Sequence, residues 1–337
     1  MSVHAIENAA PGLWTLAWRR LRADRLAMAA LAVVGAWLVL IALSALGLVA
    51  ADWEEEVGAH YAPPSFVGAP AARTESAGAT QAARDNPFDP LAADIAALRS
   101  QLPGGGAAPE RRATLPFGAD KWGHDVLKKT VKGAETSIVV GLVAALVAVG
   151  IGTLFGALSG YWGGVVDDAF TWLYNVFTAI PSILMILTVA AVLQHKGVTT
   201  VVLILGLTGW TGPYRLIRAE YMKHKAREYV LAAQAIGASH WRRMFAHIFP
   251  NASHVALVQV SILVVGFIKA EVILSFLGFG VPVGVVSWGS MLNEAQNELL
   301  LGKWWQLAAA ASAMAILVTA FSLFADALRD ALDPKVK

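Results

Sequence analysis

REYVLAAQAIGASHWRRMFAHIFPN, residues Arg227 to Asn251, is a polar-interrupted segment that lies between two strongly apolar runs. Small and apolar residues recur in it at the spacing of one helical face, first at Tyr229, Ala232, Ala233 and Ile236. Gly237 follows the last of them, as expected at a helix end, because only glycine adopts the left-handed conformation there without a Cβ penalty. The stretch therefore predicts a short helix that ends at a glycine turn.

A second short helix is predicted directly after this turn. Ser239 is a good N-cap, and the apolar face that follows consists of Trp241, Met244, Phe245 and Ile248. Arg242 and Arg243 fall on the polar side, and Pro250 is expected to end the helix. Two amphipathic helices lying on a membrane surface would show the same periodicity, so the pattern alone leaves that alternative open.

The composition is that of a polytopic membrane protein. Of the 337 residues, 57% are hydrophobic and 15% are charged, whereas a soluble domain carries about 25% charged residues. The mean hydropathy is +0.57. The chain has no cysteine, which excludes disulfides and thiolate metal sites. A net charge of +2 without a basic cluster gives no indication of nucleic-acid binding.

Six apolar runs are long enough to cross a bilayer, for which a helix needs about 20 residues. We expect spans at about 26–51, 136–161, 165–194, 198–217, 252–279 and 307–327. The first run is too long for the apolar part of a signal peptide, so we interpret it as a retained span, with cleavage as the alternative. The predicted divisions are an N-terminal interfacial helix at 1–25, the first span at 26–51, a long outer segment at 52–133 and a five-helix core at 134–337, which includes the loop at 227–250.

Within the outer segment, Asp89 and Pro90 indicate the start of a local helix. The composition of the segment, rich in Ala, Gly and Pro, predicts that it buries little core by itself. A re-entrant or interfacial stretch is expected at 280–305, where Trp288, Trp304 and Trp305 would be interface anchors.

Three features stand out inside the predicted spans. Glycines at every fourth position of the second span permit close helix contact, at Gly152, Gly156 and Gly160. Pro181 is expected to kink the third span, either where a pathway bends or simply as a tolerated kink. Lys269 and Glu271 lie in the outer half of the fifth span, where charge indicates function by default. At this spacing they cannot face each other.

Lysine and arginine in short loops predict the orientation. Four arginines precede the first span, seven basic residues lie between spans four and five, and three lie in the tail. The opposite short loops carry only Lys196 and Lys303. We therefore expect both termini and the 227–250 loop in the cytoplasm, with 52–133 and 280–305 facing outward.

Two motifs resemble a known family. Leu231-Ala232-Ala233, Gly237 and the ending at Pro250 resemble the cytoplasmic EAA loop of ABC-importer permeases, with Leu231 where that family has Glu and Glu228 one helical turn earlier. In that family the loop is a coupling helix that docks into a cleft of the ATPase subunit. The resemblance implies these ATPase-coupling residues: Glu228, Tyr229, Ala232, Ala233, Ile236, Gly237, Ala238, His240, Arg242, Arg243 and Pro250.

The segment LPFGADKWGHDVLKK, residues 115–129, is similar to the PFGTDxxGRDVLSR signature of dipeptide and oligopeptide permeases, with His124 where that family usually has Arg. The stretches at 275–280, 287–295 and 328–334 resemble further motifs of the same family. The chain thus resembles a DppC/OppC-type permease subunit from about residue 13 to its C-terminus.

This resemblance implies an all-α integral membrane protein of the bacterial cytoplasmic membrane, with six transmembrane helices of the type I ABC-importer kind. The implied substrates are di- or oligopeptides, with nickel chelates, peptide antibiotics or opines as alternatives. The implied partners are a second homologous permease, two ABC ATPases that bind ATP and Mg, an extracytoplasmic binding protein and membrane lipid. No cofactor is expected in this chain. Pro181 and Glu271 are candidates for lining the pathway, and Trp288 and Asn293 for docking the binding protein.

The sequence does not predict an enzyme. The string Gly123–Thr130 has Lys128 where a P-loop needs its second glycine, and no HExxH or GxSxG is present. The alternative of another class is an ATP-independent secondary carrier or channel, which predicts inverted repeats that we do not see. A membrane scaffold would leave the 227–250 loop unexplained.

Overall fold

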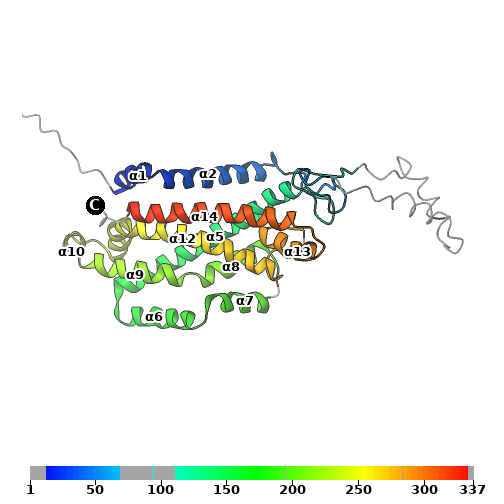
Figure 1. The fold of residues 1–337 in the computed structure, drawn as a ribbon. Coiled ribbons are helices and arrows are strands. Elements are labelled where there is room, and N and C mark those ends of the chain that lie inside the picture. Colours follow the sequence, from blue (N-terminus) through cyan, green and yellow to red (C-terminus); the bar gives the residue numbers. More distant parts are fainter. Residues whose placement is uncertain (1–12, 69–93, 95–110, 194, 283, 333–337) are drawn as a thin grey trace, which may run out of the picture.

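The computed structural model describes residues 13–68, 94, 111–193, 195–282 and 284–332. These residues form one elongated bundle of helices, with the loops of the predicted outer segment, called the outer loops, at one end and a helical loop at the other (Figure 1). Apart from four isolated β-bridges, the regular structure of the described residues is helical. The local helix predicted after Asp89 and the last residues of the tail lie outside the described residues.

Four helices are long and apolar enough to cross a membrane. They are α2 (Arg25–Ala45), α5 (Val126–Trp162), the continuous helix His240–Phe276 and α14 (Trp305–Leu332). The pair α6 (Gly164–Thr178) and α7 (Ser182–Leu193) is bent by 85° and makes a fifth if it is one span. The structure therefore supports an all-helical membrane protein with four or five candidate spans by length and composition, while the sixth span remains a prediction.

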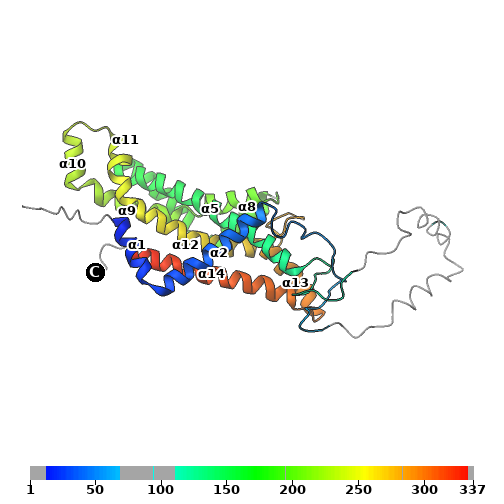
Figure 2. The same cartoon turned by 90° about the horizontal axis from the view of Figure 1, so that it is seen from above.

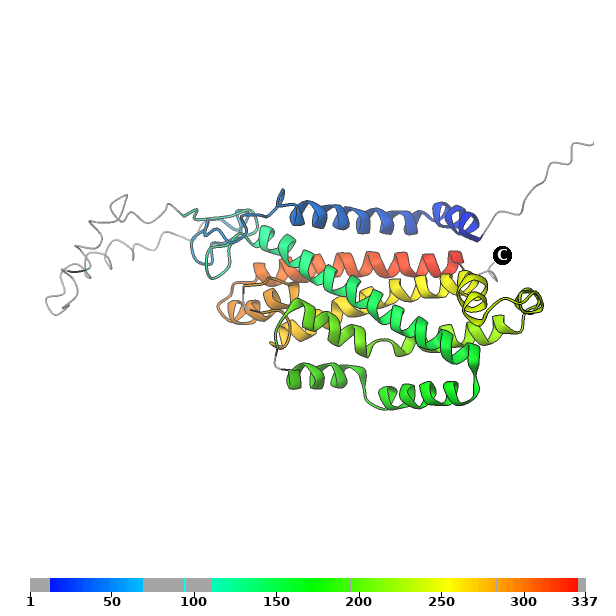
Figure 3. The ribbon, with the colours of Figure 1, turned by 180° about the vertical axis from the view of Figure 1, so that it is seen from behind.

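Helix α5 is the centre of the bundle and crosses it diagonally (Figure 3). Its predicted glycine face packs on the backbone of α9 (Thr211–Lys225). A Cβ added at Gly152 would lie 2.6 Å from the carbonyl oxygen of Trp210, and one at Gly160 would lie 2.5 Å from that of Arg218. The predicted close helix contact is confirmed, because a side chain at these positions would push α9 away.

Both ends of the outer segment differ from the expected boundaries. Helix α2 ends at Ala45 rather than at 51, and Gly47 follows with a φ of 71°. Helix α5 begins at Val126 rather than after 133, because the Asp125 carboxylate caps it by accepting from the backbone N–H of Leu127 at 2.8 Å. The described outer loops, 46–68 and 111–125, also pack together around a small apolar cluster of Ala62, Leu115 and Ala119.

The third and fourth spans are broken rather than continuous. Pro181 lies between α6 and α7, so the expected kink within one helix is corrected to a break between two. Proline lacks a backbone N–H and disfavours the helical conformation of the residue before it, which is Ile180. The fourth predicted span consists of α8 (Val198–Thr208) and α9, separated at Gly209 and Trp210.

The loop at 227–250 contains α10 (Glu228–Ala235), α11 (His240–Arg242) and a π-helix, η1 (Arg243–Ile248). Gly237 has a φ of 84°, and the Ser239 side chain accepts from the backbone N–H of Arg242 at 3.3 Å, as predicted. Pro250 does not end the second helix. It lies in the first turn of α12 (Phe249–Phe276), directly after the π-helix and within the continuous helix His240–Phe276.

Two further helices complete the bundle. Helix α1 (Leu13–Ala23) lies at the N-terminus and packs on the end of α14, close to the position predicted for an interfacial helix. Helix α13 (Trp288–Leu300) lies at the opposite end, near the outer loops. Seen from above, α10 and α11 project from the end of the bundle that is remote from α13 (Figure 2).

Candidate functional site

The projecting loop carries large apolar side chains that are mostly exposed in the described chain. Ile236 is 86% exposed and Trp241 is 57% exposed. We define the coupling surface as the exposed apolar residues of α10, α11 and η1, which are Tyr229, Leu231, Ile236, Trp241 and Phe245. Exposed apolar patches of this kind indicate a protein or membrane contact.

Helix α10 buries only part of its small and apolar side chains. Val230 and Ala233 are buried, and Val230 belongs to the cluster that contains Met244 and Ile248. Tyr229, Ala232 and Ile236, which were predicted to share the apolar face with Ala233, are exposed. The sequence predicted that these residues share one helical face and did not predict whether that face is buried, and packing on η1 leaves three of them exposed.

Arg243 ties the loop to the bundle. It was expected on the polar side, but it is buried and donates to Gln234 Oε1 at 2.6 Å. A second nitrogen of its guanidinium lies 3.0 Å from His240 Nδ1, and the group is 5.7 Å from the ring centroid of Tyr161. This correction has a physical reason, since a buried cation needs polar partners and three elements supply them here. Arg242 stays exposed.

Polar contacts continue from the loop into the bundle. The Tyr221 hydroxyl of α9 donates to the carbonyl oxygen of Met244 in η1 at 3.2 Å. On the next turn of α9, Arg218 makes two hydrogen bonds to Asp167 of α6, at 2.5 and 2.6 Å. These contacts connect the loop to α9, and α9 to α6.

The two candidates for lining a pathway have different environments. Pro181 is exposed at the break between α6 and α7. Glu271 is fully buried inside the chain, where it accepts from Ser137 Oγ at 2.6 Å and Ser275 Oγ at 2.7 Å. Glu271 therefore joins α5 to α12 in this conformation rather than facing an open path.

The two candidates for docking a binding protein also differ. Asn293 is exposed and donates to the carbonyl oxygen of Phe276 at 2.6 Å. Trp288 is fully buried, with its Nε1–H donating to the carbonyl oxygen of Thr130 at 3.0 Å. Trp305, expected as an interface anchor, is buried likewise and donates to Ala119 O at 2.6 Å. Both rings are buried and hydrogen-bonded inside the outer end, so they present no surface for a partner.

A charged cluster at the outer end was missed by the sequence reading. Asp120 accepts from the backbone N–H groups of Trp122, Gly123 and His124 at 2.8 to 3.0 Å. Its carboxylate also pairs with Lys129 at 2.7 Å. Burial alone would raise the pKa of Asp120, but the charge and hydrogen bonds of Lys129 and His124 outweigh burial and lower it. Asp120 and Lys129 both lie in the motif at 115–129, and this motif was the sequence signal that could have indicated the charged cluster.

Helix α13 completes this cluster. Lys129 also pairs with Glu294 at 2.6 Å, and Gln306 donates to the same carboxylate at 3.2 Å. Glu298 is 1% exposed, and neither of its carboxylate oxygens has a hydrogen-bond partner of good geometry among the described residues. Burial raises the pKa of Glu298 to about 7. No sequence pattern could indicate this contact, because Glu294 is 165 positions from Lys129.

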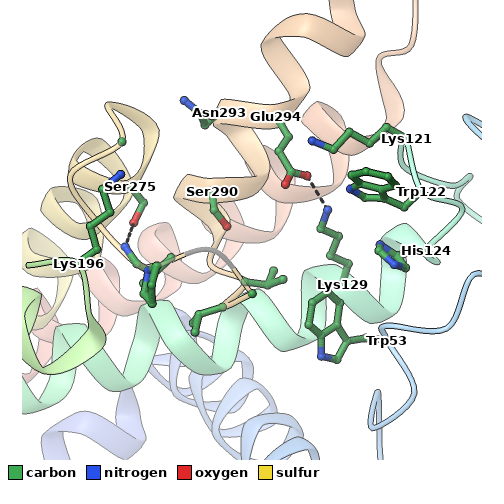
Figure 4. Close-up of a pocket in the computed structure, with 16 residues that line it drawn as sticks. Trp53, Lys121, Trp122, His124, Lys129, Lys196, Ser275, Ser290, Asn293 and Glu294 are labelled. Carbon is green, nitrogen blue, oxygen red and sulfur yellow. Dashed lines mark hydrogen bonds and ion pairs between the residues drawn. The ribbon is translucent and has the colours of Figure 1, made fainter.

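A cavity of about 440 Å³, which we call the outer cavity, lies beside the charged cluster (Figure 4). The outer loops contribute Trp53, Lys121, Trp122 and His124 to its lining, and α13 contributes Ser290, Asn293 and Glu294. Lys196, between α7 and α8, lies at the opposite end from Trp122 (Figure 4). Among the described residues, no group of three or more His, Cys, Asp or Glu side chains has the arrangement of a metal site.

Comparison with known proteins gives consistent matches over most of the chain. Residues 152–337 match the family described as the binding-protein-dependent transport system inner membrane component, and residues 12–64 match the N-terminal TM domain of oligopeptide transport permease C. The chain is 37% identical over 221 residues to the dipeptide transport system permease protein DppC of Bacillus subtilis, which is 66% of this chain and 69% of that protein.

Two oligopeptide permeases match this chain over similar lengths. The oligopeptide transport system permease protein OppC of Bacillus subtilis is 38% identical over 221 residues, covering 66% of this chain and 72% of that protein. Its namesake from Haemophilus influenzae is 32% identical over 229 residues, covering 68% and 73% respectively.

Proposed function

The chain belongs to the family of binding-protein-dependent transport system inner membrane components, and from this premise we propose that it is the permease subunit of an ATP-driven importer of di- or oligopeptides. The family is one of non-catalytic, multi-pass inner-membrane subunits. The peptide substrate is inferred from the relatives, whose names refer to dipeptide and oligopeptide transport. Nickel chelates, peptide antibiotics and opines are the alternative cargoes.

The observation that carries this function is the coupling surface. Ile236 and Trp241 are more than half exposed on a loop that Arg243 fixes to the bundle. A surface that is both apolar and fixed suits a partner that must push on it. We assign that partner as an ATPase subunit, one of two in the complex, with ATP and Mg bound by the ATPases.

The same proposal assigns the rest of the assembly. A second homologous permease forms the other half of the pathway, because alternating access needs two walls that move against each other. The exposed apolar side chains of α6 and α7, such as Trp172 at 68% and Val192 at 76%, face that permease or lipid. An extracytoplasmic binding protein delivers substrate to the outer end. With α8 and α9 counted as one span, the chain crosses the membrane six times and has both termini in the cytoplasm.

Coupling follows from the contacts between the loop and α9. Closure of the ATPases moves α10 and α11, and Arg243 transmits that movement because it bonds to both segments. The Tyr221 and Arg218 contacts then pass it to α6 through α9. ATP binding therefore drives a rigid-body shift of helices around the pathway.

The test is co-purification from mild detergent with Ile236→Glu beside the wild type. Leu300→Glu is a matched control, because Ile236 and Leu300 are each 86% exposed but lie at opposite ends of the bundle. We expect Ile236→Glu to lose the ATPase subunits and ATP-driven peptide uptake while it keeps normal expression, and Leu300→Glu to keep the ATPases. A chain that purifies alone and transports in liposomes without ATP would establish the carrier alternative instead.

A further inference from the structure

The charge of the outer cavity is not balanced by its own lining. Three lysines and one carboxylate line it, namely Lys121, Lys129, Lys196 and Glu294. Lys129 is neutralised by Asp120 and Glu294, at 2.7 and 2.6 Å. Among the described residues, neither Lys121 nor Lys196 has a carboxylate within 4.0 Å. The cavity therefore attracts an anionic group.

The two unpaired lysines are not equivalent. Lys121 lies over the ring of Trp122, with Nζ 5.5 Å from the ring centroid, so its charge is partly satisfied by the aromatic face. Lys196 makes no ion pair or ring contact within the described part of the chain. Figure 4 places Lys196 at one end of the cavity and Lys121 and Trp122 at the other. The anion is therefore best placed at the Lys196 end.

The remaining lining fits a small molecule with both polar and apolar parts. Asn293 and Ser290 lie between the two ends, and Trp53 and Trp122 provide aromatic surface at the end remote from Lys196 (Figure 4). The volume of about 440 Å³ is within the range of roughly 300–1,000 Å³ that small-molecule sites occupy. A short peptide has this character, because it has a carboxylate at one end and side chains that pack on aromatic rings.

We propose that the outer cavity is a subsite for a short peptide in transit, with Lys196 binding its C-terminal carboxylate and the Trp53–Trp122 end receiving its side chains. The proposal rests on the peptide-importer function argued above and adds a place where the permease itself contacts substrate. It also explains why Lys196, one of the few basic residues of the outer short loops, has no partner within the described chain.

The experiment compares a peptide with its amide. The permease and ATPase complex, in nanodiscs and without the binding protein, is titrated with radiolabelled alanyl-phenylalanine and with the C-terminal amide of the same dipeptide. A charge-assisted hydrogen bond contributes about 1.5 kcal/mol, so we expect the free acid to bind about tenfold more tightly than the amide. Lys196→Gln should abolish that preference by weakening the free acid alone.

Lys303→Gln is the control, because Lys303 lies at the same end of the helix bundle as the cavity but does not line it. It should keep the tenfold preference. Equal binding of acid and amide by the wild type, or a preference that survives in Lys196→Gln, would overturn the subsite. So would a failure of the wild type to bind either compound.

Uptake separates this inference from the function on which it rests. Proteoliposomes with ATP and the binding protein are assayed for alanyl-phenylalanine uptake in parallel. If the wild type imports the dipeptide but its binding does not distinguish acid from amide, the subsite is wrong and the importer stands. If the wild type imports no peptide, the proposed peptide transport itself fails.

Discussion

The two ends of this molecule use opposite means of interaction. At the coupling end, apolar side chains are exposed, and a single buried arginine with its partners fixes the loop that carries them. At the outer end, charged side chains are buried, with Asp120, Lys129 and Glu294 joined by ion pairs of 2.6 to 2.7 Å. The comparison teaches that one end leaves its apolar side chains uncovered, while the other pairs most of its buried charges within the chain and derives its order from these ion pairs.

The largest effect should come from removing the lysine at the centre of the outer cluster. Lys129→Met leaves two carboxylates without their cation, and breaking a buried ion pair costs about 3–5 kcal/mol. The neighbouring Lys128 pairs with Asp52 at the surface, where solvent screens the charges and an ion pair contributes little to stability. We expect Lys129→Met to lower the thermal unfolding midpoint in detergent strongly and Lys128→Gln to leave it almost unchanged. Similar unfolding midpoints for the two variants would show that the cluster does not stabilise the outer end.

The next prediction concerns the contacts of Arg243, which fix the loop at the coupling end. Arg243→Ala removes the bonds to Gln234 and His240, whereas Arg242→Ala removes an exposed side chain from the adjacent position. We expect Arg243→Ala to reduce ATP-driven uptake about tenfold while the ATPases still bind, since hydrogen bonds from a charged group contribute about 1.5–3 kcal/mol. Uptake and ATP hydrolysis are measured together in proteoliposomes. A larger loss for Arg242→Ala would place the coupling contact on the exposed arginine.

The pH dependence of stability sharpens the contrast between the ends. Glu298 is faced by Lys129, Asp120, Glu294 and the backbone of Lys121, and burial raises its pKa from the ordinary 4.5 to about 7. Between these two values the folded chain binds more protons than the unfolded chain, so stability falls as pH rises. The lowered pKa of Asp120 acts below its usual 3.8 and does not overlap this window.

Glu298→Gln should therefore remove part of the loss of stability between about pH 5 and pH 7. We expect its unfolding midpoint to exceed that of the wild type by a few degrees at pH 7.5 and to approach it at pH 5. Glu228→Gln, at an exposed position of the coupling end, is the control and should leave the profile unchanged. Parallel profiles for Glu298→Gln and the wild type would contradict the assignment.

The smallest effect concerns the glycine turn of the coupling loop. Gly237 has a φ of 84°, and a Cβ there would meet no atom within 4 Å, so Gly237→Ala adds backbone strain without a clash. Strain of this kind costs about 1–2 kcal/mol, and it should be absorbed by the loop alone. We expect uptake to fall about twofold with an unchanged global unfolding midpoint. An unchanged uptake together with a lowered midpoint would show that the loop is part of the global fold rather than a local unit.

The sequence predicted most of what depends on local pattern. The glycine turn at Gly237, the Ser239 cap and the glycine face of the long central helix all follow from neighbouring residues, and the structure confirms them. The family resemblance was confirmed by the comparisons. The coupling residues as a set, the six spans and the orientation stay predictions.

The errors share one cause. Arg243, Trp288 and Trp305 were assigned to surfaces because arginine and tryptophan usually lie there, yet each is buried with a specific partner. The helix that continues past Pro250 was missed as well, because proline was expected to end it. These outcomes depend on what packs against a residue, which its neighbours in the chain do not reveal.

The sequence by itself determined that this is a membrane permease with a helix-turn-helix loop at 227–250, because hydropathy, glycine spacing and caps are local properties. Only the tertiary structure decided which face of α10 is buried, which arginine locks the loop and which charges meet at the outer end. The physical reason is that the side chains of Lys129 and Glu294 come together only through the packing of α13 on α5, and that contact joins residues far apart in the chain.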